Sequence, residues 1–228
     1  RHVDHATLGE VTDLFTQYRA TLREDIAFLL EQYRVVDFAL RVVGVGSVGT
    51  RCYLVAVEGP TGDILFLQVK EAPPSVLTTY GGRRSRIPGR PGLTDFVEGH
   101  RVVAAQRILQ ANSDLFVGWM RGWAGDTADR YRVDYYWRQF RDMKGSIEPD
   151  TLDADQFRSY GALCAGLLAR AHGQSPASAA IVGFLGGSGE FAAATATWSA
   201  AYADVAEAVF DQLRRAVASG RLPAETGV

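Results

Sequence analysis

The stretch that decides the fold runs from Arg41 to Val57 and reads RVVGVGSVGTRCYLVAV. Its three glycines, Gly44, Gly46 and Gly49, have the G-x-G-x-x-G spacing found in two unrelated kinds of nucleotide site. In a dinucleotide-binding fold this motif opens a helix, and the N-terminus of that helix holds the pyrophosphate. The residues after this loop alternate as they do in a β-strand, which argues against such a site. The stretch instead predicts two antiparallel strands joined by a glycine-rich loop.

A strand, glycine loop and strand in this order are typical of protein-kinase-like folds, where the loop covers nucleotide phosphates. Glycines allow close approach to the phosphates because they carry no Cβ. Such a site also needs a lysine on the following strand, and Lys70 in LFLQVKEA fits that place. An unpaired ammonium is costly to bury in an apolar strand, so Lys70 predicts an anionic partner. The alternative is a glycine-rich hairpin that binds no phosphate.

Hydrophobic periodicity extends the prediction to the rest of the chain. Three strands are expected within residues 36–72, a helix from about Thr94 to Ala111, and two further strands in 114–123 and 130–140. Helical periodicity also covers Thr7 to Tyr33 and most of the chain after Asp153. The predicted class is α+β, with about five antiparallel strands, a flanking helix and a helical region. The expected domains are an N-terminal helical segment (1–34), a nucleotide-binding lobe (35–145) and a helical region resembling a kinase C-lobe (146–228).

Composition narrows the functional classes. A net charge of -2 gives no general basic field for nucleic acid or an acidic membrane surface, so neither is an expected partner. Cys52 and Cys164 lie far apart in sequence, and two buried thiols in a reduced, cytoplasmic protein are the expected state. No apolar run approaches the roughly 18 residues of a membrane span. The chain does not begin with Met, which favours a fragment or a matured product.

Five segments carry a family resemblance. RVVGVGSVGTRCYLV, LFLQVKEAPPSVL, NSDLFVGW, YYWRQFRDMKGS and LLARAH resemble the C-terminal half of the bacterial family catalogued as domain of unknown function 2252. The resemblance runs from about Glu31 to the end of the chain. That family is grouped with the protein-kinase-like superfamily, near small-molecule phosphotransferases of the aminoglycoside and choline kinase type. The resemblance therefore implies ATP with Mg²⁺ as cofactor and a small molecule of unknown identity as phosphate acceptor.

The resemblance also implies roles for particular residues. Lys70 would bind the α- and β-phosphates, and backbone groups of a hinge segment would bind adenine. The phosphate loop would consist of Gly44, Val45, Gly46, Ser47, Val48, Gly49 and Thr50. The hinge segment would consist of Gln139, Phe140 and Arg141.

Two departures from a kinase pattern stand out. No Asp–Asn catalytic loop follows LLARAHG; in the family, a segment resembling Gly-Asp-x-His-x-x-Asn lies upstream, which implies a circular permutation. The missing N-terminal half of the same protein is thus the expected partner, and no catalytic or metal-binding residue is assigned here. A glutamate that would pair with Lys70 is expected where the chain has Ala104, and Glu98 lies almost two turns upstream. These departures leave open a pseudokinase-like regulatory or interaction module, or a purely structural sheet.

Overall fold

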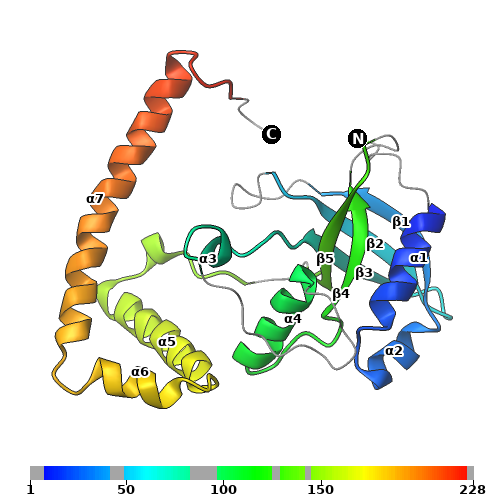
Figure 1. Ribbon diagram of the computed structural model, residues 1–228, viewed down its shortest axis with the longest axis horizontal. Helices are drawn as coiled ribbons and strands as arrows, with labels where there is room; N and C mark the ends of the chain where they lie inside the picture. The colour runs from blue at the N-terminus through cyan, green and yellow to red at the C-terminus, as the bar shows by residue number, and fades with distance from the viewer. Residues whose placement is uncertain (1–7, 42–48, 83–96, 125–128, 142–144, 225–228) are drawn as a thin grey trace. The chain divides into compact units, whose positions relative to one another are not determined.

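The computed structural model describes residues 8–41, 49–82, 97–124, 129–141 and 145–224 (Figure 1). The predicted loop residues Gly44, Val45, Gly46, Ser47 and Val48 therefore lie outside the described part of the chain. The molecule divides into two compact units, Arg1–Ala171 and His172–Val228.

The first unit is built on one five-stranded antiparallel sheet. Its strands follow the order β1-β2-β3-β5-β4 across the sheet, so the α+β class with five antiparallel strands is confirmed (Figure 1). The loop around Gly49 joins β1 to β2, which pair antiparallel, so the hairpin prediction is also confirmed. The strands are β1 (Arg34–Leu40), β2 (Cys52–Glu58), β3 (Ile64–Glu71), β4 (Gly118–Ala124) and β5 (Tyr131–Gln139).

The helices match the prediction except near the N-terminus and at Val76–Thr79, where no helix was predicted. The continuous helix expected over Thr7–Tyr33 is two helices, because the chain leaves the helical conformation before Arg23, whose φ is -65° and ψ 148°. The Thr21 hydroxyl is hydrogen-bonded to the Tyr18 carbonyl at 2.7 Å and accepts the Trp119 N–H at 3.0 Å, so it competes with helical bonding. The helices are α1 (Leu8–Arg19), α2 (Glu24–Leu30), α3 (Val76–Thr79), α4 (Glu98–Leu109), η2 (Pro149–Thr151), α5 (Ala154–Gly173), α6 (Ser178–Leu185) and α7 (Glu190–Ala218).

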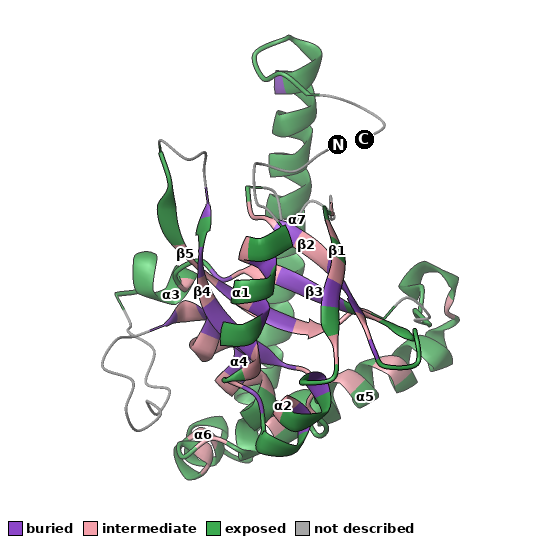
Figure 2. Cartoon of the chain, turned by 90° about the vertical axis from the view of Figure 1, so that its right-hand side faces the viewer, coloured by how far each residue is buried: buried purple, intermediate pink, exposed green. Residues whose placement is uncertain are grey.

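Helices α1 and α2 bury one face of the sheet and form the main core (Figure 2). Tyr18 of α1 is fully buried, and its ring stacks on Trp137 of β5 with centroids 4.6 Å apart. The Tyr18 hydroxyl donates a hydrogen bond of 2.6 Å to the Phe116 carbonyl. The buried aromatic contact of Tyr18 thus holds α1 on the sheet, and the hydroxyl of the same side chain has a hydrogen-bond partner.

Replacing Tyr18 with phenylalanine is expected to lower the free energy of unfolding by about 1 kcal/mol, because the Phe116 carbonyl loses its donor. Urea denaturation followed by circular dichroism measures this difference. Tyr80→Phe is the matched control, since the Tyr80 ring is 86% exposed and should change nothing. An unchanged midpoint for Tyr18→Phe would contradict the expected contribution.

Helix α4 lies against the other face of the sheet, over β4 and β5. Val103 is fully buried there, with Val117 and Trp119 in the same core cluster. No side chain caps the helix at Val97, its N-cap residue; instead the Glu98 N–H donates to Asp134 of β5 at 2.6 Å. A carboxylate at a helix N-terminus also interacts favourably with the helix dipole, so Asp134 anchors α4 to the sheet.

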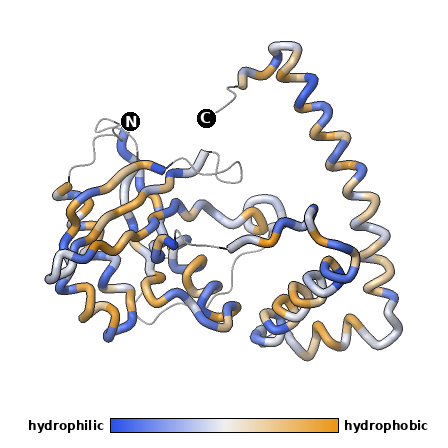
Figure 3. The backbone as a smooth tube through the Cα atoms, turned by 180° about the vertical axis from the view of Figure 1, so that it is seen from behind, coloured by the Kyte–Doolittle hydropathy of each residue, from blue (hydrophilic) through white to orange (hydrophobic). Residues whose placement is uncertain are grey.

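The second unit contains the end of α5 together with α6 and α7. Hydrophobic positions recur along α7, as the helical periodicity after Asp153 predicts (Figure 3). Its side chains are between 47% and 62% exposed, as for Phe191 and Trp198. Among the described residues, no individual helix has the length and apolar character to cross a membrane; α6 and α7, bent by 84° at their break, meet those two criteria only as a pair.

Candidate functional site

Lys70 lies near the end of β3, on the α4 side of the sheet. Its cross-strand neighbours are Cys52 of β2 and Tyr136 of β5, and Tyr136 packs against the cluster beneath α4. Cross-strand partners share a face, so the Lys70 side chain leaves the sheet on this side. The residue is half-buried, and no hydrogen bond or ion pair joins it to another residue in the part of the chain described. Lys70 is therefore a half-buried cation without an anionic partner among the described residues.

Neither nearby carboxylate pairs with Lys70. Glu98 forms an ion pair with Arg101 one turn along α4, and Arg101 also donates to the Pro73 carbonyl at 2.9 Å. Glu71 pairs across the sheet with Tyr135, which places it on the opposite face from Lys70, as its position next to Lys70 predicts. Its carboxylate accepts the Arg51 N–H at 2.5 Å. Both carboxylates thus have cationic or amide partners of their own.

Three cations act electrostatically on the buried thiol of Cys52. The pKa of this thiol is raised, mainly because the thiol is buried. The positive charges of Lys70, Arg41 and Arg138 and a hydrogen bond with Gln68 oppose this effect and lower the pKa. Arg41 follows β1 and donates its N–H to the Cys52 carbonyl at 2.7 Å. Arg138 of β5 donates twice to the Gln68 side-chain oxygen, at 3.1 and 3.0 Å. The result is a positively charged area at the start of β2, where the glycine loop ends.

The end of the loop has a conformation that favours glycine. Gly49 has a φ of +82°, in the left-handed region, and no atom of the described residues lies within 4 Å of the place a Cβ would take. Thr50 is half-buried and precedes β2 by two positions. The backbone therefore turns into β2 next to Cys52 through a residue whose conformation favours glycine.

The predicted hinge residues begin at Gln139, the last residue of β5, and continue into the two residues after it. The Gln139 N–H donates to the Asp114 carboxylate at 3.1 Å, and the Phe140 N–H donates to the Phe66 carbonyl at 2.8 Å. The Arg41 guanidinium lies over the Phe140 ring, 4.6 Å from its centroid. Two backbone N–H groups of this segment already donate hydrogen bonds within the protein. An adenine base would therefore have to bind the backbone carbonyl groups or the N–H of Arg141, an exposed residue.

Lys70 is predicted from the sequence, whereas four residues on the same face of the sheet are not: Arg41, Cys52, Gln68 and Arg138. The position of Gln68, two residues before Lys70 in an apolar strand, was a signal, because alternation puts both on one face. Arg138 could not be found in this way, since its place opposite Gln68 depends on the register between β3 and β5. Among the described residues, no group of three or more His, Cys, Asp or Glu side chains is arranged to hold a metal ion.

The family model described as "Uncharacterized protein conserved in bacteria (DUF2252)" matches residues 1–216. The chain belongs to this family. The match extends to the N-terminal side of the resemblance that began near Glu31, so in this DUF2252 chain α1 and α2 are part of the family sequence. Neither the curated proteins nor the solved structures contain a match to it.

Proposed function

We propose that this DUF2252 chain binds ATP with Mg²⁺ on the α4 side of its sheet, as the nucleotide-binding part of a kinase-like small-molecule phosphotransferase. The observation that carries the proposal is Lys70, a half-buried ammonium with no partner among the described residues. Arg41 and Arg138 add positive charge around the same thiol, Cys52. A triphosphate is an anion that such a group of cations would attract.

The order of elements supports the same proposal. A glycine loop between β1 and β2, a lysine on β3, then α4 and a hairpin of β4 and β5 follow the order of a kinase-like N-lobe. In this arrangement the backbone around Gly49 and Thr50 contacts the phosphates, and Lys70 neutralises their charge. The segment of Gln139, Phe140 and Arg141 contacts adenine.

Phosphoryl transfer depends mainly on positioning and charge neutralisation, so binding and turnover are separable. In our proposal the general base and the Mg²⁺ ligands come from the N-terminal half that the family resemblance places upstream, and the acceptor is a small molecule. The proposed location is the cytoplasm, where ATP is present and the two free cysteines, Cys52 and Cys164, stay reduced.

Titration calorimetry with ATP and Mg²⁺ tests this proposal. The Lys70→Ala variant is expected to bind ATP at least about tenfold more weakly, since it loses a charge-assisted contact worth roughly 1.4 kcal/mol or more. Arg158→Ala is the control, because Arg158 lies on α5 and pairs only with Asp155 among the residues described. No heat of binding with the unmodified chain, or equal affinity in Lys70→Ala, would refute the nucleotide site.

One observation favours a second candidate, a non-catalytic regulatory or interaction module. Glu98 is engaged with Arg101 rather than with Lys70, whereas active kinases pair the corresponding lysine with a helix glutamate. ATP binding without phosphate release or transfer, in the chain combined with its upstream half, would identify this module. Phosphate release above the buffer rate would identify the phosphotransferase.

A further inference from the structure

Glu71 joins the end of β3 to the residue that follows the proposed phosphate loop. That loop ends at Thr50, so Arg51 is the first residue after it. The Arg51 N–H donates to one oxygen of the Glu71 carboxylate at 2.5 Å, and the Glu71 N–H donates to the Arg51 carbonyl at 3.1 Å. Both main-chain polar groups of Arg51 are therefore hydrogen-bonded to a single residue of β3.

The other oxygen of the Glu71 carboxylate binds the side chain of the same arginine. The Arg51 guanidinium lies 3.4 Å from this oxygen and also donates to the hydroxyl of Tyr131, the first residue of β5, at 3.1 Å. The side chains of Glu71 and Arg51 are only 12% and 27% exposed, so solvent screens this ion pair less than it screens a surface pair. Two donors of Arg51 thus hold the carboxylate in place.

The position of Glu71 next to Lys70 connects this network to the proposed nucleotide site. Consecutive residues of a strand point to opposite faces, so Lys70 leaves the sheet on the α4 side while the Glu71 side chain bonds Arg51 on the other side. One peptide unit joins the two residues, so Glu71 fixes the end of the loop relative to the lysine. Groups that are held in place before a ligand arrives lose less entropy on binding.

We propose that Glu71 is a positioning residue of the nucleotide site, whose carboxylate holds the end of the phosphate loop in place relative to Lys70. The inference rests on the proposed function and adds a residue that itself contacts neither ATP nor Mg²⁺. Charge alone makes the opposite prediction. A carboxylate next to Lys70 repels phosphates bound there, so its removal would by itself strengthen ATP binding.

The Glu71→Gln variant separates positioning from charge, because the amide has the same shape and no charge. It offers one oxygen acceptor to the two donors of Arg51, so the end of the loop is held less firmly. Calorimetry with ATP and Mg²⁺ should show binding about three- to tenfold weaker than in the unmodified chain. Adenosine, which carries no phosphate, should keep its affinity in an NMR titration. Glu71→Asp, which keeps the charge on a shorter side chain, should likewise weaken ATP and not adenosine.

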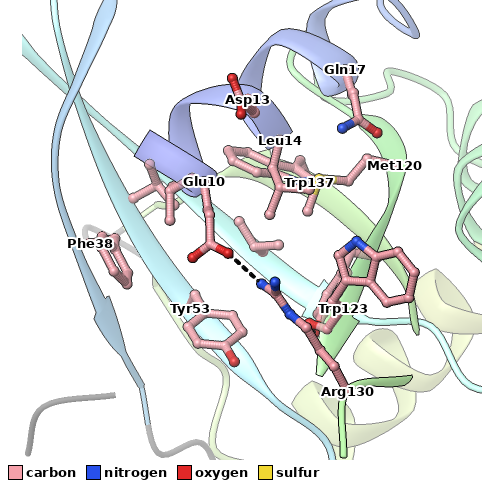
Figure 4. Close-up of a pocket in the computed structure, with 14 residues that line it drawn as sticks. Glu10, Asp13, Leu14, Gln17, Phe38, Tyr53, Met120, Trp123, Arg130 and Trp137 are labelled. Carbon is pink, nitrogen blue, oxygen red and sulfur yellow. Dashed lines mark hydrogen bonds and ion pairs between the residues drawn. The ribbon is translucent and has the colours of Figure 1, made fainter. Parts of the chain in front are cut away.

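The matched control is another ion pair on the same face of the sheet. A largely apolar cavity of about 240 Å³ lies there between α1 and the sheet (Figure 4). Arg130 lines this cavity and pairs with Glu10 of α1 at 2.7 Å. Neither residue is adjacent to the loop or to Lys70 in the sequence. Arg130→Gln breaks this pair and should change neither affinity.

The outcomes distinguish this inference from the proposed function. Absence of ATP binding in the unmodified chain would overturn both. Weaker ATP binding in Lys70→Ala, together with unchanged or tighter binding in Glu71→Gln, would overturn the positioning role alone. Equal losses of ATP and adenosine affinity in the two Glu71 variants would overturn it as well, because they would indicate a general disturbance of the sheet rather than of the phosphate contacts.

Discussion

Replacing Gly99 with alanine is expected to lower the free energy of unfolding of the first unit by about 3 kcal/mol. A Cβ at Gly99 would lie 2.3 Å from the Tyr135 carbonyl oxygen and 3.0 Å from the Cβ of Trp119. The nearest of these atoms is backbone in the middle of the sheet, so it has no rotamer by which to move away. Helix α4 would have to shift outward, and the buried contacts of Val103 would be lost.

Gly161→Ala is the matched control for this experiment. Gly161 is also helical, but no atom lies within 4 Å of its added Cβ. Alanine should there stabilise α5 by about 1 kcal/mol through helix propensity alone. Urea denaturation of both variants gives the comparison. A Gly99→Ala variant as stable as the unmodified chain would show that α4 is not packed against β5 as closely as the structure has it.

Most of the sheet was predictable because its signals are local. The alternation after Gly49 and the turn before Ile64 place three strands in sequence, and both were found from residue types alone. The break after α1 was not predictable, because Thr21 is helix-compatible in isolation. It leaves the helix through a hydrogen bond to Trp119, which is 98 residues away in the chain. Long-range contacts of this kind override local propensity.

The same distinction applies to the candidate site. Lys70 was found because an ammonium in an apolar strand is unusual by itself. The cations near it were not found, because Arg41 and Arg138 come together only through the register of four strands. The close approach at Gly99 was also not predicted, since a helical glycine has no local signature of the backbone that it faces.

Alternation along β3 gives this strand one charged face and one apolar face. Gln68 and Lys70 lie on the α4 side with the cations, whereas Leu67 and Val69 lie in the core beneath α1. The adjacent strand repeats the pattern, with Cys52 on one side and Tyr53 on the other. The proposed nucleotide site and the apolar cavity are therefore compatible in one sheet, because they use side chains on opposite faces.

Replacing Trp137 with alanine is expected to cost about 4 kcal/mol of unfolding free energy, because it removes the largest fully buried side chain of the core. The Tyr18 ring, stacked at 4.6 Å, would lose its partner, and the 240 Å³ cavity would open into the core. Trp198→Ala is the matched control, since Trp198 of α7 is 62% exposed and should cost far less. Thermal and urea denaturation measure both variants.

The Trp137→Phe variant separates the contribution of the aromatic ring to stability from the contribution of the indole N–H. Phenylalanine keeps part of the stacking with Tyr18 and removes a buried donor that has no partner among the residues described. Loss of an unsatisfied N–H offsets part of the lost volume, so the net cost should stay within about 1.5 kcal/mol. A cost close to that of Trp137→Ala would mean that the N–H is bonded in solution, for example to a bound water.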